Sequence, residues 1–231
     1  MIISGEGKKM NRLITIEGTD CSGKKTQTNM LYERLRTEGN KIASLGYPDY
    51  KSPTGKIVGG PYLGKKHIGE GLFPEGATNV DPKVAALYYA ADRRYNAYKI
   101  DGLLKEGYDV LLDRYVESNM GHIAGNVADS EERRKMYEWL EALEYGLLEL
   151  RRPDLTIFLY LPYQYALELM KNRAEAADQH EADENHLMNA EKAYLELTEI
   201  YGFKRINCVH NKKMRTEEDI HEEVYSLVKK R

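Results

Sequence analysis

Residues 18–26, with the sequence G-T-D-C-S-G-K-K-T, have the spacing of a loop that binds phosphate. Gly18, Gly23 and Lys24 fit the pattern G-x-x-x-x-G-K, in which backbone N–H groups surround a di- or triphosphate and the lysine neutralises its charge. The apolar run 13–16 before the loop predicts a buried strand, and the residues after it predict a helix whose N-terminus points at the same phosphate. The stretch therefore predicts a nucleotide site, whereas a glycine-rich turn with surface lysines would not require this strand and helix.

Lys25 stands at the position where such loops usually carry the serine or threonine that binds Mg²⁺. An ammonium group cannot coordinate a cation. We therefore expect a magnesium ion to be held by carboxylates and water, or by Thr26 if the loop register allows it.

A second group of charged residues follows the strand predicted at 108–112. Asp113 and Arg114 are adjacent there, and burying such a pair is costly unless the two side chains bind something. Asp113 is placed like the acidic residue that holds Mg²⁺ through water in phosphoryl-transfer sites, and Arg114 is placed to bridge two phosphates. Asn119 and His122 follow on a predicted helix or turn that faces the same mouth.

Two tyrosines lie where an acceptor molecule could bind. Tyr50 comes just after the strand predicted at 41–45, at the edge where open α/β sheets bind ligands, although it also suits an aromatic turn. Tyr89 precedes Arg93 by four residues on a helix predicted to begin at Asp81, so that the ring and the guanidinium share a face. The pair suits either the sandwiching of a planar base or a solvated arginine that leans on a tyrosine.

Strands alternate with helices along the chain, which predicts a doubly wound, five-stranded parallel α/β sheet with the nucleotide at the carboxyl ends of the strands. The predicted strands are 13–16, 41–45, 108–112, 155–161 and 205–209, and the predicted helices are 27–35, those that start at Asp81 and Ser130, 165–173, 190–201 and 216–230.

Three further expectations concern surfaces. The helix after Asp81 is expected to face the core with Val84, Leu87, Tyr88, Ala91 and Tyr95. The apolar stripe within 136–150 suits a core or a dimer surface. The glycine-rich residues 59–79 are expected to form a loop.

The composition bounds the class of protein. A chain of 231 residues suits a single domain with a full core, and a net charge of -3 argues against a nucleic-acid coat or a polybasic membrane binder. No apolar run reaches the ~20 residues of a membrane span. Cys21 and Cys208 form no CxxC pair, which favours a reducing, cytoplasmic setting over a disulfide framework or a zinc site.

Residues 1–10 are expected to be a flexible tail, and the polar residues 174–186 a lid or a solvated linker.

Together these segments resemble the thymidylate kinase family of P-loop nucleoside-monophosphate kinases. The matching stretches, in family order, are I-E-G-T-D-C-S-G-K-K-T-Q (16–27), Y-P-D-Y (47–50), L-Y-Y-A-A-D-R (87–93), D-R-Y-V-E-S-N (113–119), R-R-P-D-L-T-I-F-L (151–159) and D-Q-H-E-A-D (178–183). The resemblance implies an adenylate-kinase-like fold with sheet order 2-3-1-4-5 and a lid. It also implies a homodimer and the transfer of the γ-phosphoryl group of ATP to dTMP with Mg²⁺.

The resemblance implies roles at the ATP site. Lys24 and the loop amides would hold the ATP phosphates, and Lys25 would add charge near the transferred group. The implied ATP-binding residues are Gly18, Thr19, Asp20, Cys21, Ser22, Gly23, Lys24, Lys25, Thr26 and Arg173, the implied metal residues are Asp113 and Asp20, and the implied catalytic residues are Lys24, Lys25, Asp113 and Arg114.

It also implies an acceptor site. Tyr50 and Arg114 would grip the acceptor phosphate. Tyr89 would stack on thymine while Arg93 and Asn119 read its edge. The implied acceptor-binding residues are Asp20, Tyr50, Tyr89, Arg93, Arg114, Asn119, His122 and Glu181.

Two positions depart from the family pattern. His122 stands where a tyrosine usually packs against the deoxyribose, which leaves sugar discrimination open. The family also usually has an arginine either at the position of Cys21 or in the lid, but residues 174–186 contain none. Lys25 or Arg173 would then supply the transition-state charge. The alternatives are therefore a kinase for another deoxynucleoside monophosphate, or a catalytically weak nucleotide-binding regulator.

Overall fold

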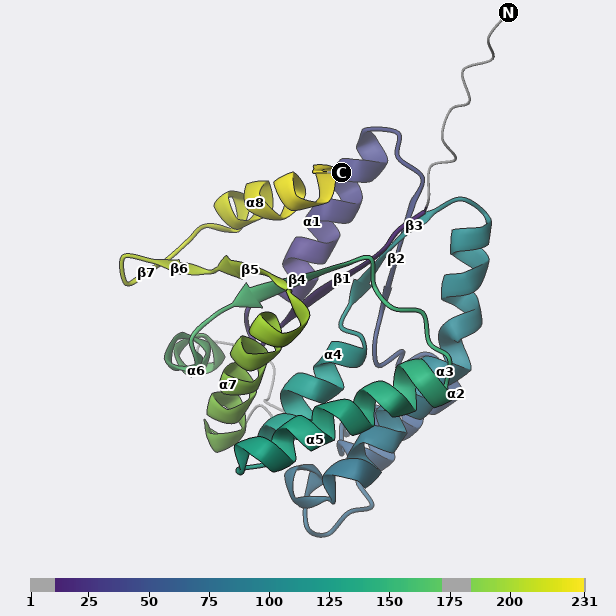
Figure 1. The fold of residues 1–231 in the computed structure, drawn as a ribbon, viewed down its shortest axis with the longest axis vertical. Helices are drawn as coiled ribbons and strands as arrows, with labels where there is room; N and C mark the ends of the chain where they lie inside the picture. The colour runs from purple at the N-terminus through teal and green to yellow at the C-terminus, as the bar shows by residue number, and fades with distance from the viewer. Residues whose placement is uncertain (1–10, 172–183, 231) are drawn as a thin grey trace, which may run out of the picture.

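The structure is a computed structural model that describes residues 11–171 and 184–230. Within these residues five strands form one parallel sheet in the order β2-β3-β1-β4-β5, which confirms the predicted fold class (Figure 1). The strands are β1 (Leu13–Gly18), β2 (Ile42–Gly46), β3 (Asp109–Asp113), β4 (Leu155–Tyr160) and β5 (Lys204–Asn207), and a small antiparallel ribbon is formed by β6 (Val209–His210) and β7 (Lys213–Met214).

Helices connect the strands and cover both faces of the sheet. They are α1 (Lys24–Thr37), α2 (Pro53–Ile57), α3 (Pro82–Lys105), α4 (Val116–Ser118), α5 (Ser130–Glu141), α6 (Tyr163–Lys171), α7 (Glu184–Tyr201) and α8 (Glu217–Lys229), together with the π-helices η1 (Val58–Tyr62), η3 (Asn119–Ile123) and η5 (Ala142–Leu147) and the 3₁₀-helices η2 (Ala77–Asn79) and η4 (Ala124–Asn126).

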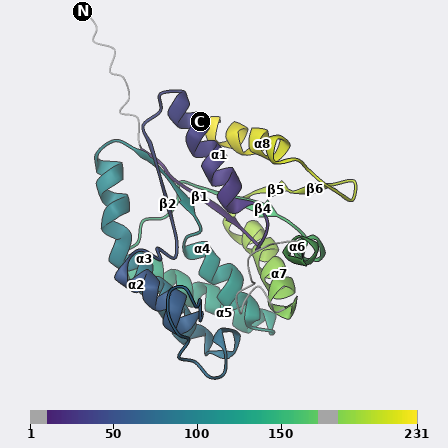
Figure 2. The ribbon, with the colours of Figure 1, turned by 180° about the vertical axis from the view of Figure 1, so that it is seen from behind.

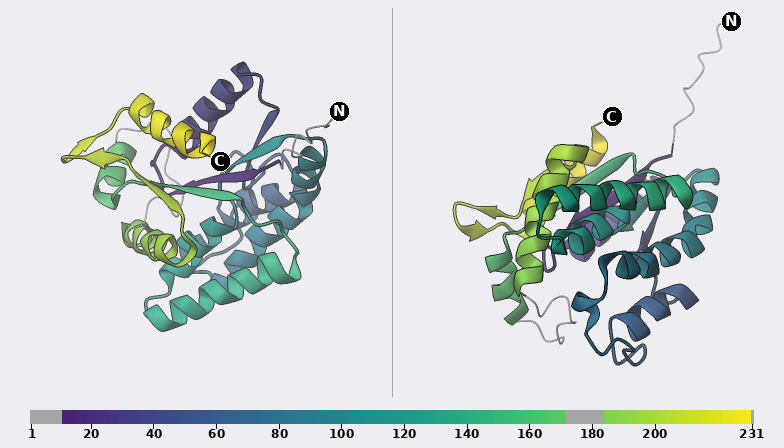
Figure 3. Two further views of the ribbon diagram at one scale, coloured as in Figure 1. Left: turned by 45° about the horizontal axis from the view of Figure 1, so that its top comes forward. Right: turned by 60° about the horizontal axis from the view of Figure 1, so that its bottom comes forward.

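The central strands turn alternate side chains toward two separate cores, as expected for a parallel sheet covered on both faces. Ile14 and Leu111 pack in a core with residues of α1 and α8. Leu13 and Leu112 pack on the other side with residues of α3, α5 and α7. The two helical layers are visible on either side of the sheet in Figure 3, and α1 and α8 lie side by side in Figure 2.

The strand register brings the ends of three strands to one edge of the sheet. Asp113 at the end of β3 pairs with Ile16 of β1 and with Gly46 of β2. The loop after β1 and the charged residues after β3 therefore emerge side by side, as the sequence predicts.

Several element boundaries differ from the prediction. Helix α1 begins at Lys24, directly after the loop, and Asp129 rather than Ser130 caps α5, because the Asp129 carboxylate accepts hydrogen bonds from the N–H groups of Glu131 and Glu132. Helix α7 begins at Glu184, within the predicted lid 174–186, while residues 172–183 and the predicted tail 1–10 lie outside the described part of the chain.

The segment 59–79 is more ordered than the predicted loop. It contains most of η1 and all of η2, and the ring of Tyr62 stacks on Tyr88 and meets Tyr89 edge-on at 5.6 Å between centroids. Tyr62 is fully buried and donates a hydrogen bond to the carbonyl of Ala77. The aromatic contacts therefore fasten this segment to α3, a role that glycine content alone does not indicate.

The buried face of α3 is not the predicted one. Its buried positions are mostly small or polar, and include Ala86, Ala90 and Arg93. Small residues let the helix approach the sheet closely, and the polar side chains face the site described below. Of the predicted core residues, Tyr88 does pack against the core, whereas Val84, Leu87 and Tyr95 point outward at 40%, 48% and 52% exposure.

Candidate functional site

The loop after β1 has the backbone conformation that its glycines allow. Gly23 has φ +83°, in the left-handed region, and a Cβ atom on Gly18 would lie 2.7 Å from the carbonyl oxygen of Leu159. Lys24 is 7% exposed and its Nζ donates a 2.6 Å hydrogen bond to the carbonyl of Thr19. Cys21 also adopts a positive φ of 58°. The predicted residues 18–26 thus form the end of β1, a loop over 19–23 and the first turn of α1.

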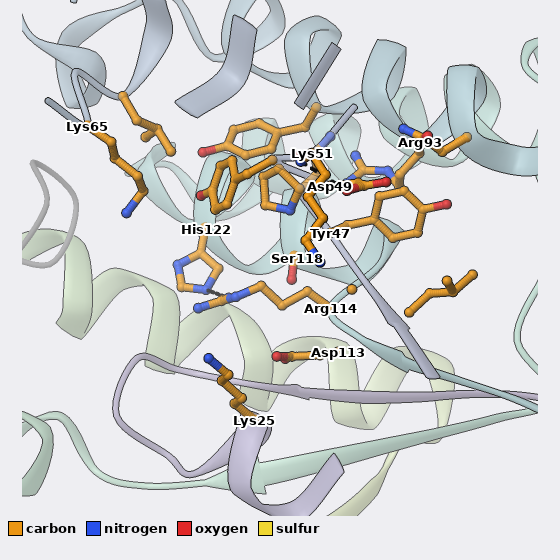
Figure 4. A pocket seen from close by; sticks show the side chains of 18 of the residues that line it. Lys25, Tyr47, Asp49, Lys51, Lys65, Arg93, Asp113, Arg114, Ser118 and His122 are labelled. Atoms are coloured by element: carbon orange, nitrogen blue, oxygen red, sulfur yellow. Dashed lines mark hydrogen bonds between the residues drawn. The ribbon is translucent and has the colours of Figure 1, made fainter. Parts of the chain in front are cut away.

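Arg114 lies next to this loop. Its backbone φ of 67° is unusual for a residue with a side chain, and its N–H donates to the carbonyl of Ile16 in β1. Its Nη2 donates to the Asp20 carboxylate in an ion pair, and its Nη1 bonds to Nε2 of His122 at 2.9 Å. The guanidinium group is therefore fixed between the loop and the helical segment that follows β3 (Figure 4).

A cavity of about 770 Å³ opens in front of Arg114. The side chains of Lys25 and Asp113 approach it from one side and those of His122 and Lys65 lie across from them (Figure 4). The predicted residues that line it are Asp20, Lys25, Tyr50, Tyr89, Arg93, Asp113, Arg114, Asn119 and His122. Residues separated by nearly 100 positions in the sequence are thus brought to one pocket. Arg173 and Glu181 lie outside the described residues.

Arg93 is held by a carboxylate that the sequence did not single out. Its Nη2 and Nε donate to the two oxygens of Glu144, at 2.6 and 2.5 Å, and its Nη1 donates to the carbonyl of Tyr115. Both side chains are buried, and Nδ2 of Asn119 donates to the same carboxylate at 2.8 Å. The interpretation of Arg93 as a solvated arginine is wrong, because this pair places a fixed guanidinium in the wall of the cavity.

Two more buried carboxylates shape the pocket. Asp92 of α3 accepts hydrogen bonds from the N–H of Asp49 and from the hydroxyls of Ser52 and Thr54, which ties the segment around Tyr50 to α3. The Tyr50 side of the cavity is therefore built on a charged anchor.

Glu17 in β1 does the same for the segment after β3. It accepts from the N–H of Tyr115 at 2.6 Å, from the hydroxyl of Ser118 at 2.7 Å and from the hydroxyl of Tyr194 at 2.9 Å. Burial raises the pKa of Glu17, although these hydrogen bonds oppose the shift. The backbone next to Arg114 is thereby tied to the central strand.

Burial and charge act together on the ionisable groups of the site. Burial and the charge of Arg114 together lower the pKa of Lys24 to about 8, although nearby carboxylates oppose the shift. Burial alone would raise the pKa of Asp20, but the charge of Arg114 and other cations lowers it below its usual range. Burial also lowers the pKa of His122 well below 6.5. Cationic groups thus dominate the electrostatics of the site, which suits an anionic ligand.

The site offers one carboxylate suited to a metal ion. Oδ1 of Asp113 is buried without a hydrogen-bond partner in the described structure, whereas the Asp20 carboxylate is paired with Arg114. An unpaired carboxylate oxygen beside a phosphate loop fits a hard divalent cation such as Mg²⁺. The described residues contain no cluster of three or more His, Cys, Asp or Glu side chains that would bind a metal without the nucleotide.

Residues that the sequence analysis did not select also line the cavity. They include Lys51, Leu63, Lys65 and Lys99. Lys99 forms an ion pair with Asp49 at 2.7 Å, and Nζ of Lys65 lies 5.8 Å from the ring centre of Tyr50. In the sequence, the Y-P-D-Y stretch indicated this part of the site, whereas these lysines have no distinctive spacing.

Comparisons with known proteins agree with this geometry. The profile of the family described as Thymidylate kinase matches residues 16–224. The chain is 30% identical to the thymidylate kinase of Mycobacterium tuberculosis over 80% of this chain and 85% of that protein. It is also 30% identical to the thymidylate kinase of Halothermothrix orenii, over 94% of this chain and 95% of the relative. The solved thymidylate kinase of Candida albicans shares the fold with a TM-score of 0.72 at 22% identity, covering 95% of this chain and 91% of that one. The chain therefore belongs to the thymidylate kinase family.

Proposed function

We propose that this protein transfers the γ-phosphoryl group of ATP to dTMP, giving dTDP, as a step of nucleotide biosynthesis. Membership of the thymidylate kinase family supports this activity. The observation that carries the proposal is that one cavity is lined both by Lys25 of the phosphate loop and by Arg114 and Tyr89 of the acceptor side. Donor and acceptor phosphates would therefore meet in front of Arg114.

At the donor side, the amides of residues 18–26 and Lys24 bind the ATP phosphates. In the structure Lys24 donates to the carbonyl of Thr19, and a triphosphate would replace that carbonyl as its partner. Lys25 is exposed and its side chain points into the cavity, so we assign it the charge that neutralises the transferred group (Figure 4). Arg173, outside the described residues, is the other candidate for that charge.

At the acceptor side, Arg114 and Tyr50 bind the phosphate, and Tyr89 stacks on the base. Arg93 and Asn119, both anchored on Glu144, read the edge of the base. We assign Glu181, which is outside the described residues, to the sugar of the acceptor. No covalent intermediate is needed, because positioning and neutralisation of a loose transition state account for phosphoryl transfer in such enzymes.

Mg²⁺ bound with ATP would supply positive charge that neutralises the charge developing on the transferred phosphate. We assign Asp113 to it because Oδ1 of this residue lacks a partner in the described structure. Asp20 has the secondary role, since its carboxylate already neutralises Arg114.

We propose that the protein is a homodimer joined through α3. Four large apolar residues of the 24-residue helix α3 are exposed: Val84, Leu87, Tyr95 and Tyr98. They are three, eight and three positions apart, which places them on one side of the helix. An apolar stripe of this length on one helix suits a self-complementary contact between two copies.

We also propose that residues 1–231 form a single kinase domain whose lid is the part of 174–186 that precedes α7, and that the protein works in the cytoplasm. Cys21 and Cys208 form no disulfide, which suits a reducing compartment. No helix in the described residues combines the length and the apolarity needed to cross a bilayer.

An acceptor screen tests the proposed function. ADP release is measured with ATP, Mg²⁺ and dTMP, dUMP, dGMP, dAMP or CMP in turn. We expect dTMP to be the preferred acceptor. No ADP formation with any monophosphate would favour a regulator that binds ATP without turnover. Preference for another deoxynucleotide would favour the second candidate function, a kinase for a different deoxynucleoside monophosphate. His122 supports this candidate, because it stands at the position near the sugar and both of its ring nitrogens already have partners in the protein.

A further inference from the structure

Two histidines and an asparagine form a chain that ends on Arg114. Nε2 of His122 lies 2.9 Å from Nη1 of Arg114, and Nδ1 of His122 lies 3.3 Å from Nε2 of His186. Nδ1 of His186 then lies 3.0 Å from Oδ1 of Asn126. The two imidazole rings are stacked with 5.5 Å between their centres, and the His186 residue is only 2% exposed.

The chemistry of these groups gives the chain a single direction. A guanidinium group can only donate, so Nε2 of His122 must accept, and the ring is neutral with its proton on Nδ1. That proton is donated to Nε2 of His186. His186 therefore also carries its proton on Nδ1 and donates it to the amide oxygen of Asn126. Both rings are held in the same tautomer, and protonation of either would set two donors against each other.

This direction suits the charge at its end. Each imidazole turns its lone pair toward Arg114, so the aligned dipoles stabilise the guanidinium and strengthen one another. Asp20 holds Nη2 of Arg114 and His122 holds Nη1, which fixes the plane of the guanidinium. Each of these nitrogens has a second N–H, and the pair can therefore receive two phosphate oxygens at once.

We infer that His186 and Asn126 are positioning residues that, through His122, hold Arg114 in the orientation that binds the acceptor phosphate. The inference rests on the proposed function for the identity of the acceptor, but the chain itself does not depend on it. His186 and Asn126 lie on α7 and η4 and are not among the residues that line the cavity, so in the described structure their link to the acceptor site runs through His122.

The tautomers can be measured without any substrate. Nitrogen-15 NMR of the imidazole rings in the full chain should show His122 and His186 neutral, each protonated at Nδ1 and bare at Nε2. Exposed His210 serves as the internal reference for a ring in water. A proton on Nε2 of either buried ring overturns the inference whatever the enzyme phosphorylates.

A double-mutant cycle tests the function of the chain. His186→Phe keeps the stacked ring but removes both nitrogens, and should weaken dTMP binding by roughly 3- to 10-fold while the KM for ATP and the kcat stay within about twofold. His186→Gln, which restores an acceptor, should recover most of the loss. His122→Phe should weaken dTMP binding at least as much, and adding His186→Phe to it should have no further effect.

The outcomes separate the two proposals. An unsubstituted protein that does not phosphorylate dTMP contradicts the proposed function. An active unsubstituted protein with unchanged dTMP binding in His186→Phe, or with additive effects in the double variant, contradicts the positioning role. If His186→Phe fails to fold, Asn126→Ala at the half-buried end of the chain should show the same split in smaller measure. His210→Phe is the control and should leave both KM values unchanged.

Discussion

At the scale of single residues, the site is organised around Arg114. Its left-handed backbone conformation, its ion pair with Asp20 and its bond to His122 fix a guanidinium group in front of the phosphate loop. A residue with a side chain in the left-handed region costs of order 1 to 3 kcal/mol and persists where surrounding contacts determine it. The contacts of Arg114 with Asp20 and His122 hold this residue in place and also orient its guanidinium group toward the cavity.

Lys25 is expected to act on turnover rather than on ATP binding. Its ammonium group is exposed and lines the cavity, so we assign it a role in the reaction rather than in holding the loop together. Lys25→Ala should therefore lower kcat by about 10²-fold, in the range found for removing one charge-stabilising group. The KM for ATP should change by less than about threefold. Steady-state kinetics measures both quantities.

Lys213→Ala is the matched control for Lys25→Ala, since Lys213 is exposed on the β6–β7 ribbon. It should leave kcat unchanged. An unaltered turnover number in Lys25→Ala would assign the missing charge to another residue.

The lowered pKa of Lys24 leads us to expect that the protein takes up protons when ATP binds. Because burial lowers its pKa to about 8, roughly half of the Lys24 amines are neutral at pH 8 in the free protein, and a bound triphosphate favours the protonated form. Calorimetry in buffers of different ionisation enthalpy should show an uptake of about half a proton at pH 8 and almost none at pH 6.5. Heats independent of the buffer at pH 8 would contradict the lowered pKa.

At the scale of elements, the buried carboxylates explain how helices position the site. Glu144 reaches Arg93 from η5, the π-helix that continues α5, and Asp92 and Glu17 fasten the loops beside Tyr50 and Arg114. Each of these carboxylates is itself buried. The walls of the cavity are therefore fixed by charged hydrogen bonds rather than by apolar packing alone.

The Arg93–Glu144 pair should be important for stability. Glu144→Gln leaves the buried guanidinium without its counter-charge, so the free energy of unfolding should fall by about 3 kcal/mol. Urea denaturation measures the loss. Glu33→Gln removes the partner of exposed Arg36 and should cost less than about 0.5 kcal/mol. A loss below about 1 kcal/mol for Glu144→Gln would mean that the pair is dispensable for folding.

The sequence predicted most of these elements but not their inward faces. The strands, the phosphate loop and Asp113-Arg114 follow from local patterns, since apolar runs and glycine spacing are local properties. The role of Glu144 does not, because a glutamate on an amphipathic helix is normally exposed, whereas this one lies four residues after buried Leu140 and is itself buried. The predicted buried face of α3 was largely wrong for a related reason: alanines and Arg93 fill much of it, while Val84, Leu87 and Tyr95 lie outside.

At the scale of the whole molecule, the outward apolar stripe of α3 has a consequence for assembly. In Figure 1, α3 lies at the opposite side of the molecule from β6 and β7. Its exposed apolar side chains are covered by no other part of the described chain. A second copy would bury them in the proposed homodimer.

Leu87→Glu should therefore convert the dimer to monomers. Leu87 is 48% exposed near the middle of the stripe, and a charge there would have to be desolvated on both copies. Light scattering coupled to gel filtration measures the mass. Met214→Glu, at an exposed apolar residue on the far ribbon, should leave the dimer intact. A monomeric unsubstituted protein would contradict the assignment of α3.

The central claim is that Arg114 joins the donor and acceptor phosphates in one cavity. Transfer of labelled γ-phosphate from ATP to dTMP, compared between the unsubstituted protein and Arg114→Ala, tests it most directly. We expect labelled dTDP from the unsubstituted protein and a transfer rate lower by about 10³-fold or more in Arg114→Ala. The affinity for ATP should change by only a few fold. An Arg114→Ala protein that keeps more than about a tenth of the transfer rate would contradict it.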